Sequence, residues 1–250
     1  MPERPARPAS GADALYPFLA GGELTWAAGS VAGRRVQSLP IERDMRQSTI
    51  EKAREIAALR ARVLGEQQER LARCACAMAR RFRSGSRLFA FGNGGSATDA
   101  QSVASLFLCP PWGQPLAALA LPSAVAIVTA LANDVGFEVV YARQIEAIGR
   151  DGDVAVGLST SGNSPNVLRG LGEARRRGLL TVGFAGYEGG SMAASAEIDH
   201  LFVVPSPSVH RIQEAQTTLY HVLWELTQLA LESGRDGGGH APEEGGTADE

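Results

Sequence analysis

Short apolar runs alternate with segments of helical spacing over residues 87–232, and this alternation constrains the fold more than any other feature. A short apolar run bounded by turn residues is typical of a buried strand, whereas apolar residues at every third or fourth position indicate a helix. Strands that are apolar throughout and separated by helices predict a parallel sheet covered on both faces. The sequence therefore predicts the α/β class.

The expected elements follow in chain order: strand 87–91, helix 95–108, strand 116–120, helix 123–132, helical stretch 137–148, strand 153–158, helix 164–177, strand 179–184, short helix 190–196, strand 200–204 and helix 209–232.

Composition divides the chain into three parts. Residues 1–45 are rich in Pro, Gly, Ala and Arg without a sustained period, which predicts an irregular N-terminal arm. Residues 46–232 are expected to form one domain, led by one long helix or two stacked helices over 48–82. Residues 233–250 are rich in Gly and Glu, and we expect a disordered tail.

Two loops follow apolar strands and open helices. The first is Gly92–Ser96, and the second is Ser159–Ser164, which carries four hydroxyl groups in six residues. A strand that turns into a helix N-terminus exposes free backbone N–H groups at the positive end of the helix dipole, which favours a phosphate. Ser96 is expected to be the N-cap of its helix. Neither the dinucleotide-binding glycine pattern nor a P-loop lysine is present in the first loop.

Charge and composition exclude several classes of protein. With a net charge of −3, the chain has no general attraction for nucleic acid or anionic membranes. No apolar run approaches the roughly 18 residues of a membrane span, and the first residues, MPERPARPAS, lack the apolar region of a signal peptide. The three cysteines, Cys74, Cys76 and Cys109, have no metal-binding spacing and are expected to be reduced thiols of a cytoplasmic protein.

Six motifs, in order over residues 48–232, resemble the sugar isomerase (SIS) domain family, and within it the phosphoheptose isomerase type. They are Gly92–Asp99, Ala132–Phe137, Gly152–Asp153, Ser159–Asn166, Gly186–Gly190 and Arg211–Glu214. The resemblance implies a flavodoxin-like three-layer sandwich and a cytoplasmic homotetramer with active sites between subunits. It also implies a phosphorylated sugar as substrate, either sedoheptulose 7-phosphate or a related sugar phosphate.

The resemblance also implies roles for individual residues. The phosphate contacts fall on Asn93, Gly94, Ser96, Ser159, Thr160, Ser161 and Ser164. Asp134 matches an acidic site residue, while Gln213 and His221 match the catalytic centre, with His221 as the base. Gln213 and His221 are eight residues apart, so both lie on the same side of the last helix. Histidine suits aldose–ketose isomerisation because its pKa lies near neutrality.

Four positions depart from the family pattern, among them Pro110 in place of an Arg and His210 in place of an Asp. Ser102 and Leu106 stand where the isomerases carry a His and a Glu, which in some members bind zinc together with the Gln and the later His. A leucine cannot transfer a proton or ligate a metal, so no zinc centre is expected. Four residues remain candidates for the missing acid: Asp99, Asp134, His210 and Glu214.

Three functions remain open at this point. The favoured one is a sugar-phosphate isomerase with His221 as base, because Gln213, His221 and Asp134 are retained. The second is a non-catalytic binding protein, either a sugar-phosphate sensor or a protein that associates with a replication initiator, and Leu106 favours it. The third is a structural tetramer whose loops only cap helices.

Overall fold

The computed structural model of the chain describes residues 40–236, so the predictions for residues 1–39 and 237–250 lie outside the described part. Contacts divide the chain into a unit of Met1–Gln47 and a unit of Ser48–Glu250, and the sheet, both loops and the last helix belong to the second. Its five strands are β1 (Leu88–Gly92), β2 (Ala118–Ala120), β3 (Val154–Ser159), β4 (Leu180–Gly186) and β5 (His200–Val204).

The helices are α2 (Pro40–Arg83), α3 (Gly95–Leu108), η2 (Leu121–Ser123), α4 (Val125–Asp134), η3 (Phe137–Val139), α5 (Val140–Ile148), α6 (Pro165–Arg176), α7 (Gly190–Ala193) and α8 (Val209–Asp236). The strand and helix predictions are thus confirmed in order and type. The leading helix is one element, not two stacked ones.

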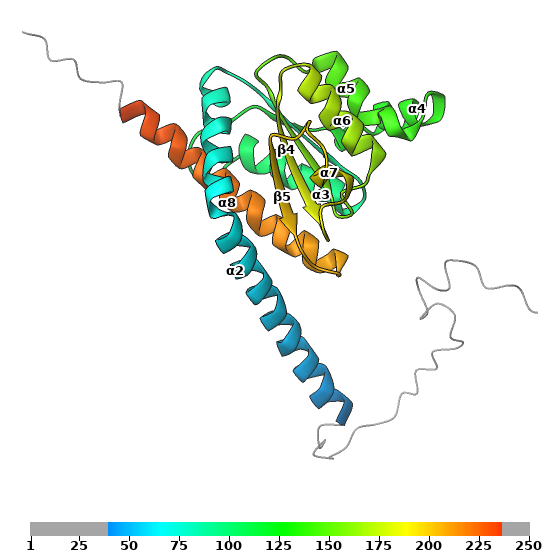
Figure 1. Ribbon diagram of the computed structural model, residues 1–250, viewed down its shortest axis with the longest axis vertical. Helices are drawn as coiled ribbons and strands as arrows, with labels where there is room; N and C mark the ends of the chain where they lie inside the picture. The colour runs from blue at the N-terminus through cyan, green and yellow to red at the C-terminus, as the bar shows by residue number, and fades with distance from the viewer. Residues whose placement is uncertain (1–39, 237–250) are drawn as a thin grey trace, which may run out of the picture. The chain divides into compact units, whose positions relative to one another are not determined.

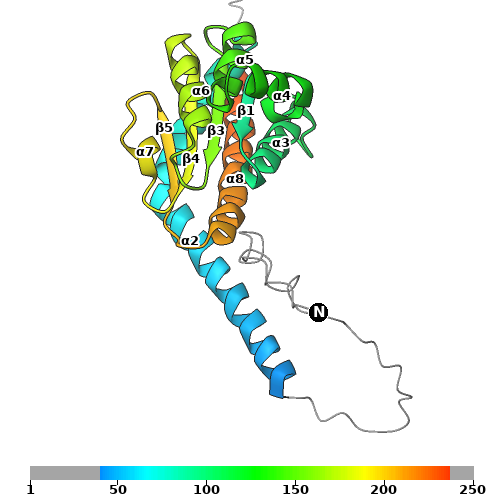
Figure 2. The same cartoon turned by 90° about the vertical axis from the view of Figure 1, so that its right-hand side faces the viewer.

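All strands are parallel, in the order β2-β1-β3-β4-β5. Helices α2, α3 and α8 cover one face, and α4, α5 and α6 cover the other (Figures 1 and 2). Side chains alternate between the faces: Leu88 and Ala90 point toward the first helical layer, and Phe89 and Phe91 toward the second. The predicted flavodoxin-like sandwich is confirmed.

Two predicted boundaries were wrong at the ends of this region. Residues 40–45, expected to be irregular, belong to α2, since proline is compatible with the first helical turn and the acidic Asp44 suits the N-terminal part of a helix. Residues 233–236, expected to be disordered, belong to α8. The Gly run of the tail begins only at Gly237.

Helix α2 covers the free edge of β5 (Figure 1). The Gln67 side chain donates to the Val203 carbonyl at 2.8 Å and accepts from the Val203 N–H at 3.3 Å. Arg70 donates to the Leu201 carbonyl, and Arg62 to the Pro205 carbonyl at 3.2 Å. These side chains take the place of a sixth strand, and they block pairing with another chain.

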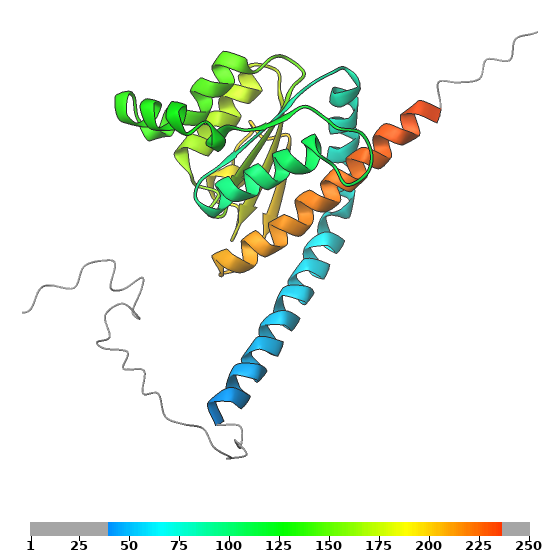
Figure 3. The same cartoon turned by 180° about the vertical axis from the view of Figure 1, so that it is seen from behind.

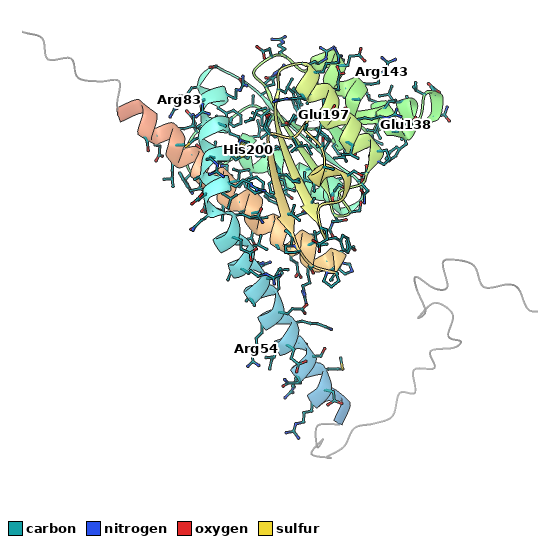
Figure 4. All side chains as sticks on the ribbon, in the orientation of Figure 1. Arg54, Arg83, Glu138, Arg143, Glu197 and His200 are labelled. Carbon is teal, nitrogen blue, oxygen red and sulfur yellow. The ribbon has the colours of Figure 1, made fainter. Side chains whose placement is uncertain are left out.

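Helices α2 and α8 cross on the same face of the sheet (Figure 3). Oε2 of Glu55 in α2 lies 3.7 Å from Nε of Arg211 in α8, and the Arg83 side chain donates to the Ala230 carbonyl. His200, at the start of β5, lies on the α2 side, whereas Glu138 and Arg143 lie on the α4–α5 side (Figure 4). Within residues 40–236, every helix is too short or too polar to span a bilayer.

Candidate functional site

The two predicted loops lie side by side at the carboxyl end of the sheet. The first follows β1 and the second follows β3, and these strands pair directly, with Gly92 opposite Leu158. Ligands of open parallel sheets bind at this edge, beyond the carboxyl ends of the strands.

A pair of asparagine side chains joins the two loops. Asn93 of the first loop donates its Nδ2–H to Oδ1 of Asn166 at 2.8 Å, and Asn166 donates back to Oδ1 of Asn93 at 2.8 Å. The Tyr141 hydroxyl is shared between two acceptors of the first loop, the Gly92 carbonyl and, at 3.2 Å, Oδ1 of Asn93. Asn93 therefore holds the first loop in place.

The first loop begins α3 through glycine, not serine. Gly94 is the N-cap, at φ 56° and ψ −123°, and no side chain caps the helix. The prediction that Ser96 is the N-cap was wrong, because the cap lies two residues earlier, at Gly94, in a conformation that favours glycine. Ser96 is buried in the first turn, while Gly94 is exposed.

The second loop gathers serine hydroxyls at the end of β3. Ser159 Oγ lies 2.9 Å from Ser164 Oγ and 3.4 Å from Ser161 Oγ, and the N–H of Asn163 donates to Ser161 Oγ at 3.2 Å. Ser164 is the N-cap of α6, yet its side chain makes no capping bond. Its hydroxyl therefore belongs to the serine cluster, and the first N–H groups of α6 receive no cap from this side chain.

The segment after β4 holds the second loop rigid. Asn163 Oδ1 accepts from the N–H of Ser191 at 2.7 Å and from its hydroxyl at 2.8 Å. The Gly162 carbonyl accepts from Met192 at 3.0 Å, and the Thr160 carbonyl accepts from Gly186 at 3.0 Å. Backbone atoms, and not only flexible side chains, thus fix the loop.

Helix α8 brings Gln213 to the first loop. A methyl group at Gly95 would lie 2.1 Å from Nε2 of Gln213, so a side chain at position 95 would displace the end of Gln213. Gln213 therefore lies against the first of the two predicted loops.

His221 is exposed on the same helix. Its Nδ1 lies 2.8 Å from the Thr217 carbonyl, which can only accept, so Nδ1 carries the proton. The neutral ring then has its lone pair on Nε2. Tyr220 stacks on the imidazole, with ring centroids 5.0 Å apart. This tautomer suits a base.

The substituted positions on α3 do not fit a zinc ion. Ser102 is exposed and donates to the Thr98 carbonyl at 3.2 Å, and Leu106 packs against the core. Among the side chains that the structure describes, no three His, Cys, Asp or Glu residues come together as a metal-binding group. The donor set is too poor for a structural or catalytic zinc site.

Asp134 stays apart from the loops. It is exposed at the end of α4, where Asn133 donates to its Oδ1 at 2.7 Å. In the described part of the chain no hydrogen bond connects it to either loop. A role in catalysis therefore remains a prediction for Asp134, as it does for the other site residues.

Asp99 and Tyr220 form a polar contact between α3 and α8. Burial raises the pKa of Asp99 to about 6, and hydrogen bonding by the Tyr220 hydroxyl offsets part of this rise. Burial raises the pKa of Tyr220, and the neighbouring Asp99 carboxylate adds to the rise. Sequence reasoning missed Tyr220, Tyr141 and Ser191, because their contacts come from elements distant in the chain. Asn166 stood at the end of a recognised motif, but its partner could not be read from spacing.

Comparison with known proteins agrees with this geometry. The SIS domain family model matches residues 53–186, more than half of the chain. This chain belongs to the SIS domain family. The match covers both loops and Asn166, and it ends before α8.

Relatives of this SIS protein include phosphoheptose isomerases. That of Desulfovibrio desulfuricans is 46% identical over 182 residues, covering 72% of this chain and 85% of the relative. That of Aquifex aeolicus is 47% identical over 148 residues, covering 58% and 76%. The structure of the Neisseria gonorrhoeae phosphoheptose isomerase matches with a TM-score of 0.68 at 33% identity, covering 73% of this chain and 98% of that one.

Proposed function

We propose that this SIS protein is a sugar-phosphate isomerase of the phosphoheptose isomerase type, which interconverts sedoheptulose 7-phosphate, or a related ketose phosphate, and its aldose. The packing of Gln213 against Gly95 carries the proposal, because it sets the helix that holds His221 beside the first loop. The identity to phosphoheptose isomerases over most of their length supports the same activity.

The residues take the following roles in this proposal. Hydroxyl and backbone N–H groups of both loops hold the phosphate. In the first loop they belong to Asn93, Gly94 and Ser96, and in the second loop to Ser159, Thr160, Ser161 and Ser164. Gln213 orients the sugar, and Nε2 of His221 moves the proton between adjacent carbons. No step uses a metal, since Ser102 and Leu106 provide no suitable donors.

A homotetramer in the cytoplasm, with active sites between subunits, belongs to the same proposal. Helix α4 has no buried residue and exposes apolar side chains, such as Val125 (64% exposed) and the nearby Phe137 (50%). Exposed apolar surface of this kind favours contact with another subunit. Asp134, at the end of α4, would then lie at or near that contact. Light scattering on the purified protein tests the stoichiometry.

Turnover of sedoheptulose 7-phosphate tests the activity directly. The purified chain is incubated with this ketose, and the aldose product is followed. We expect His221→Ala to lower kcat by about 10²–10⁴, because a positioned base contributes this much. The variant should keep the thermal stabilisation that the ligand gives, since the phosphate loops are intact.

The second candidate is a sugar-phosphate sensor without catalysis. Leu106 favours it, because a leucine in this position packs on the core and offers no acid. Stabilisation of the wild-type protein by the sugar phosphate, without any product, would decide for the sensor and against the isomerase. Capture of a replication initiator by the same protein would point to the initiator-associating type.

A further inference from the structure

Aldose–ketose isomerisation needs a second proton-transfer group beside the base. One group moves the proton between carbons, and another must protonate the carbonyl oxygen and deprotonate the neighbouring hydroxyl. His221 can serve as the first group. The second group must be a titratable side chain that reaches the space between the first loop and α8.

Three residues of α3 share the face that meets α8. Asp99, Ser102 and Leu106 are separated by three and four residues, so they lie in one row along the helix. The Tyr220 hydroxyl of α8 interacts with both Asp99 and Ser102, and it lies 3.5 Å from Thr217 Oγ1. The same phenol ring stacks on His221. Asp99 therefore stands one side chain away from the base.

We propose that Asp99 is the second proton-transfer residue of the site and that the Tyr220 hydroxyl holds its carboxyl group in position. This inference rests on the proposed isomerase function.

The carboxyl group of Asp99 has an oxygen free for this work. Its Oδ2 atom is buried and makes no hydrogen bond to the described protein. A buried oxygen without a partner is costly, above all when it is charged, which favours the neutral acid form of the Asp99 carboxyl group. Ser102, one turn further along α3, is exposed, so this row of side chains borders on solvent.

The other acidic and basic candidates are placed less well. Glu214 is engaged with Arg211 at 2.6 Å, Asp134 is exposed on α4, and His210 is exposed in the first turn of α8. Among the four, Asp99 is the residue that combines partial burial, an unpaired oxygen and contact with the neighbour of His221.

The proton balance closes with these two groups. Nε2 of His221 takes a proton from C1 of the ketose, a C1–C2 double bond forms, and the carboxylic acid of Asp99 protonates the O2 oxygen to give an enediol. The Asp99 carboxylate then takes the proton from O1 as the C1 carbonyl forms, and the His221 imidazolium returns its proton to C2. Both residues end in their starting states.

The pH dependence follows from the surroundings of Asp99. The titratable group that faces it is Tyr220 from α8, and the polar Ser102 lies on its own helix. With a pKa of about 6, the acid form of Asp99 is lost above that pH, so kcat/KM in the ketose-to-aldose direction should fall above about pH 6. Because hydrogen bonding by Tyr220 lowers the pKa of Asp99, Tyr220→Phe should move this limb to higher pH.

Steady-state kinetics from pH 5 to 9 on the full chain test the proposal, with sedoheptulose 7-phosphate as the probe. We expect Asp99→Asn to lower kcat about 100-fold or more and to remove the alkaline limb, while ligand-induced thermal stabilisation is retained. Glu225→Gln, an exposed carboxylate of α8, is the matched control and should keep wild-type kinetics.

Failure of the proposal and failure of the proposed function give different results. If wild type is active and Asp99→Asn retains half of kcat, or keeps the alkaline limb, the role of Asp99 is overturned and the isomerase stands. If wild type is inactive toward the sugar phosphates that it binds, the function fails and the role fails with it. If Asp99→Asn does not fold, the shift of the limb in Tyr220→Phe decides, and an unmoved limb overturns the proposal.

Discussion

The side chains of Asn93 and Asn166 form a closed pair in which each amide donates to the other at 2.8 Å. The two residues follow different strands and are separated by 73 positions. Their pairing connects the glycine loop to the first turn of the helix that leaves the serine loop. The amide pair thus adds a side-chain connection between two loops whose strands already pair directly.

Asn166→Ala should loosen both loops together. It removes the amide pair and the bond from the Val167 N–H to Asn166 Oδ1. Since Asn166 is almost fully buried, we expect a loss of about 1–3 kcal/mol in the free energy of unfolding. Binding of inorganic phosphate, measured by calorimetry, should weaken as well. Gln101→Ala, which removes one exposed amide contact, is the control and should change neither.

Gly162→Ala should disrupt the serine loop. Gly162 has φ 66°, and a methyl group there would lie 2.0 Å from the Gly189 carbonyl oxygen. The clash is with backbone, so the loop or the segment after β4 must move. We expect a fall in the melting temperature and loss of phosphate binding. Gly65→Ala in α2 meets no atom within 4 Å and should instead stabilise by about 0.5–1 kcal/mol. Equal melting temperatures for the two variants would contradict this account.

Gln67→Ala should expose the edge of β5. The side chain makes two hydrogen bonds to Val203, and without them this backbone is open to another strand. We expect destabilisation by about 1–2 kcal/mol and more self-association during thermal unfolding, as followed by light scattering. Gln68→Ala alters an exposed neighbour on the same helix and should stay within about 0.5 kcal/mol of wild type. Aggregation to the same extent in both variants would argue against edge protection by Gln67.

Asp99→Asn should change how stability depends on pH. The pKa of Asp99 rises from 3.8 to about 6 on folding, so the folded state binds this proton more tightly than the unfolded chain. Its contribution to stability is complete below about pH 4 and is lost as the pH rises through 6. The asparagine variant lacks this loss. The free energy of unfolding of the variant, relative to that of wild type, should therefore rise by about 1–2 kcal/mol between pH 4 and pH 8. This figure is smaller than the full pKa shift would give, because Asp99 is partly exposed to solvent.

Urea unfolding at pH 4 and pH 8 measures this difference, with Glu225→Gln as the control. A difference between Asp99→Asn and wild type that does not vary with pH would mean that Asp99 ionises normally in the folded protein.

Local sequence patterns predicted the strands and helices well. Helix 95–108 and strand 200–204 match α3 and β5 in both bounds, because their apolar spacing and flanking turn residues leave no other assignment. The errors lay at the ends of elements: the strand predicted at 116–120 spans Ala118–Ala120, and the strand predicted at 179–184 spans Leu180–Gly186. Ser96 was expected to cap α3, but the strand-to-helix turn uses the positive φ of Gly94. A serine in a loop has several uses, and spacing does not select among them.

The site was predicted in part. The hydroxyl-rich loop identified Ser159, Ser161 and Ser164, whose side chains do come together. Asp134, which the family resemblance assigns to the site, is exposed at the end of α4, and its role stays a prediction.

By itself, the sequence determined the α/β class, the glycine-rich and serine-rich loops after two of the strands and the substitutions at Ser102 and Leu106, because each depends on residue type and short spacing. Only the tertiary structure decided how these parts meet. The amide pair of Asn93 and Asn166, the packing of Gln213 on Gly95 and the contact of Asp99 with Tyr220 each join residues far apart in the chain. Such contacts arise when helices pack on a common sheet. The residues next to each member in the chain do not indicate which distant residue it will contact.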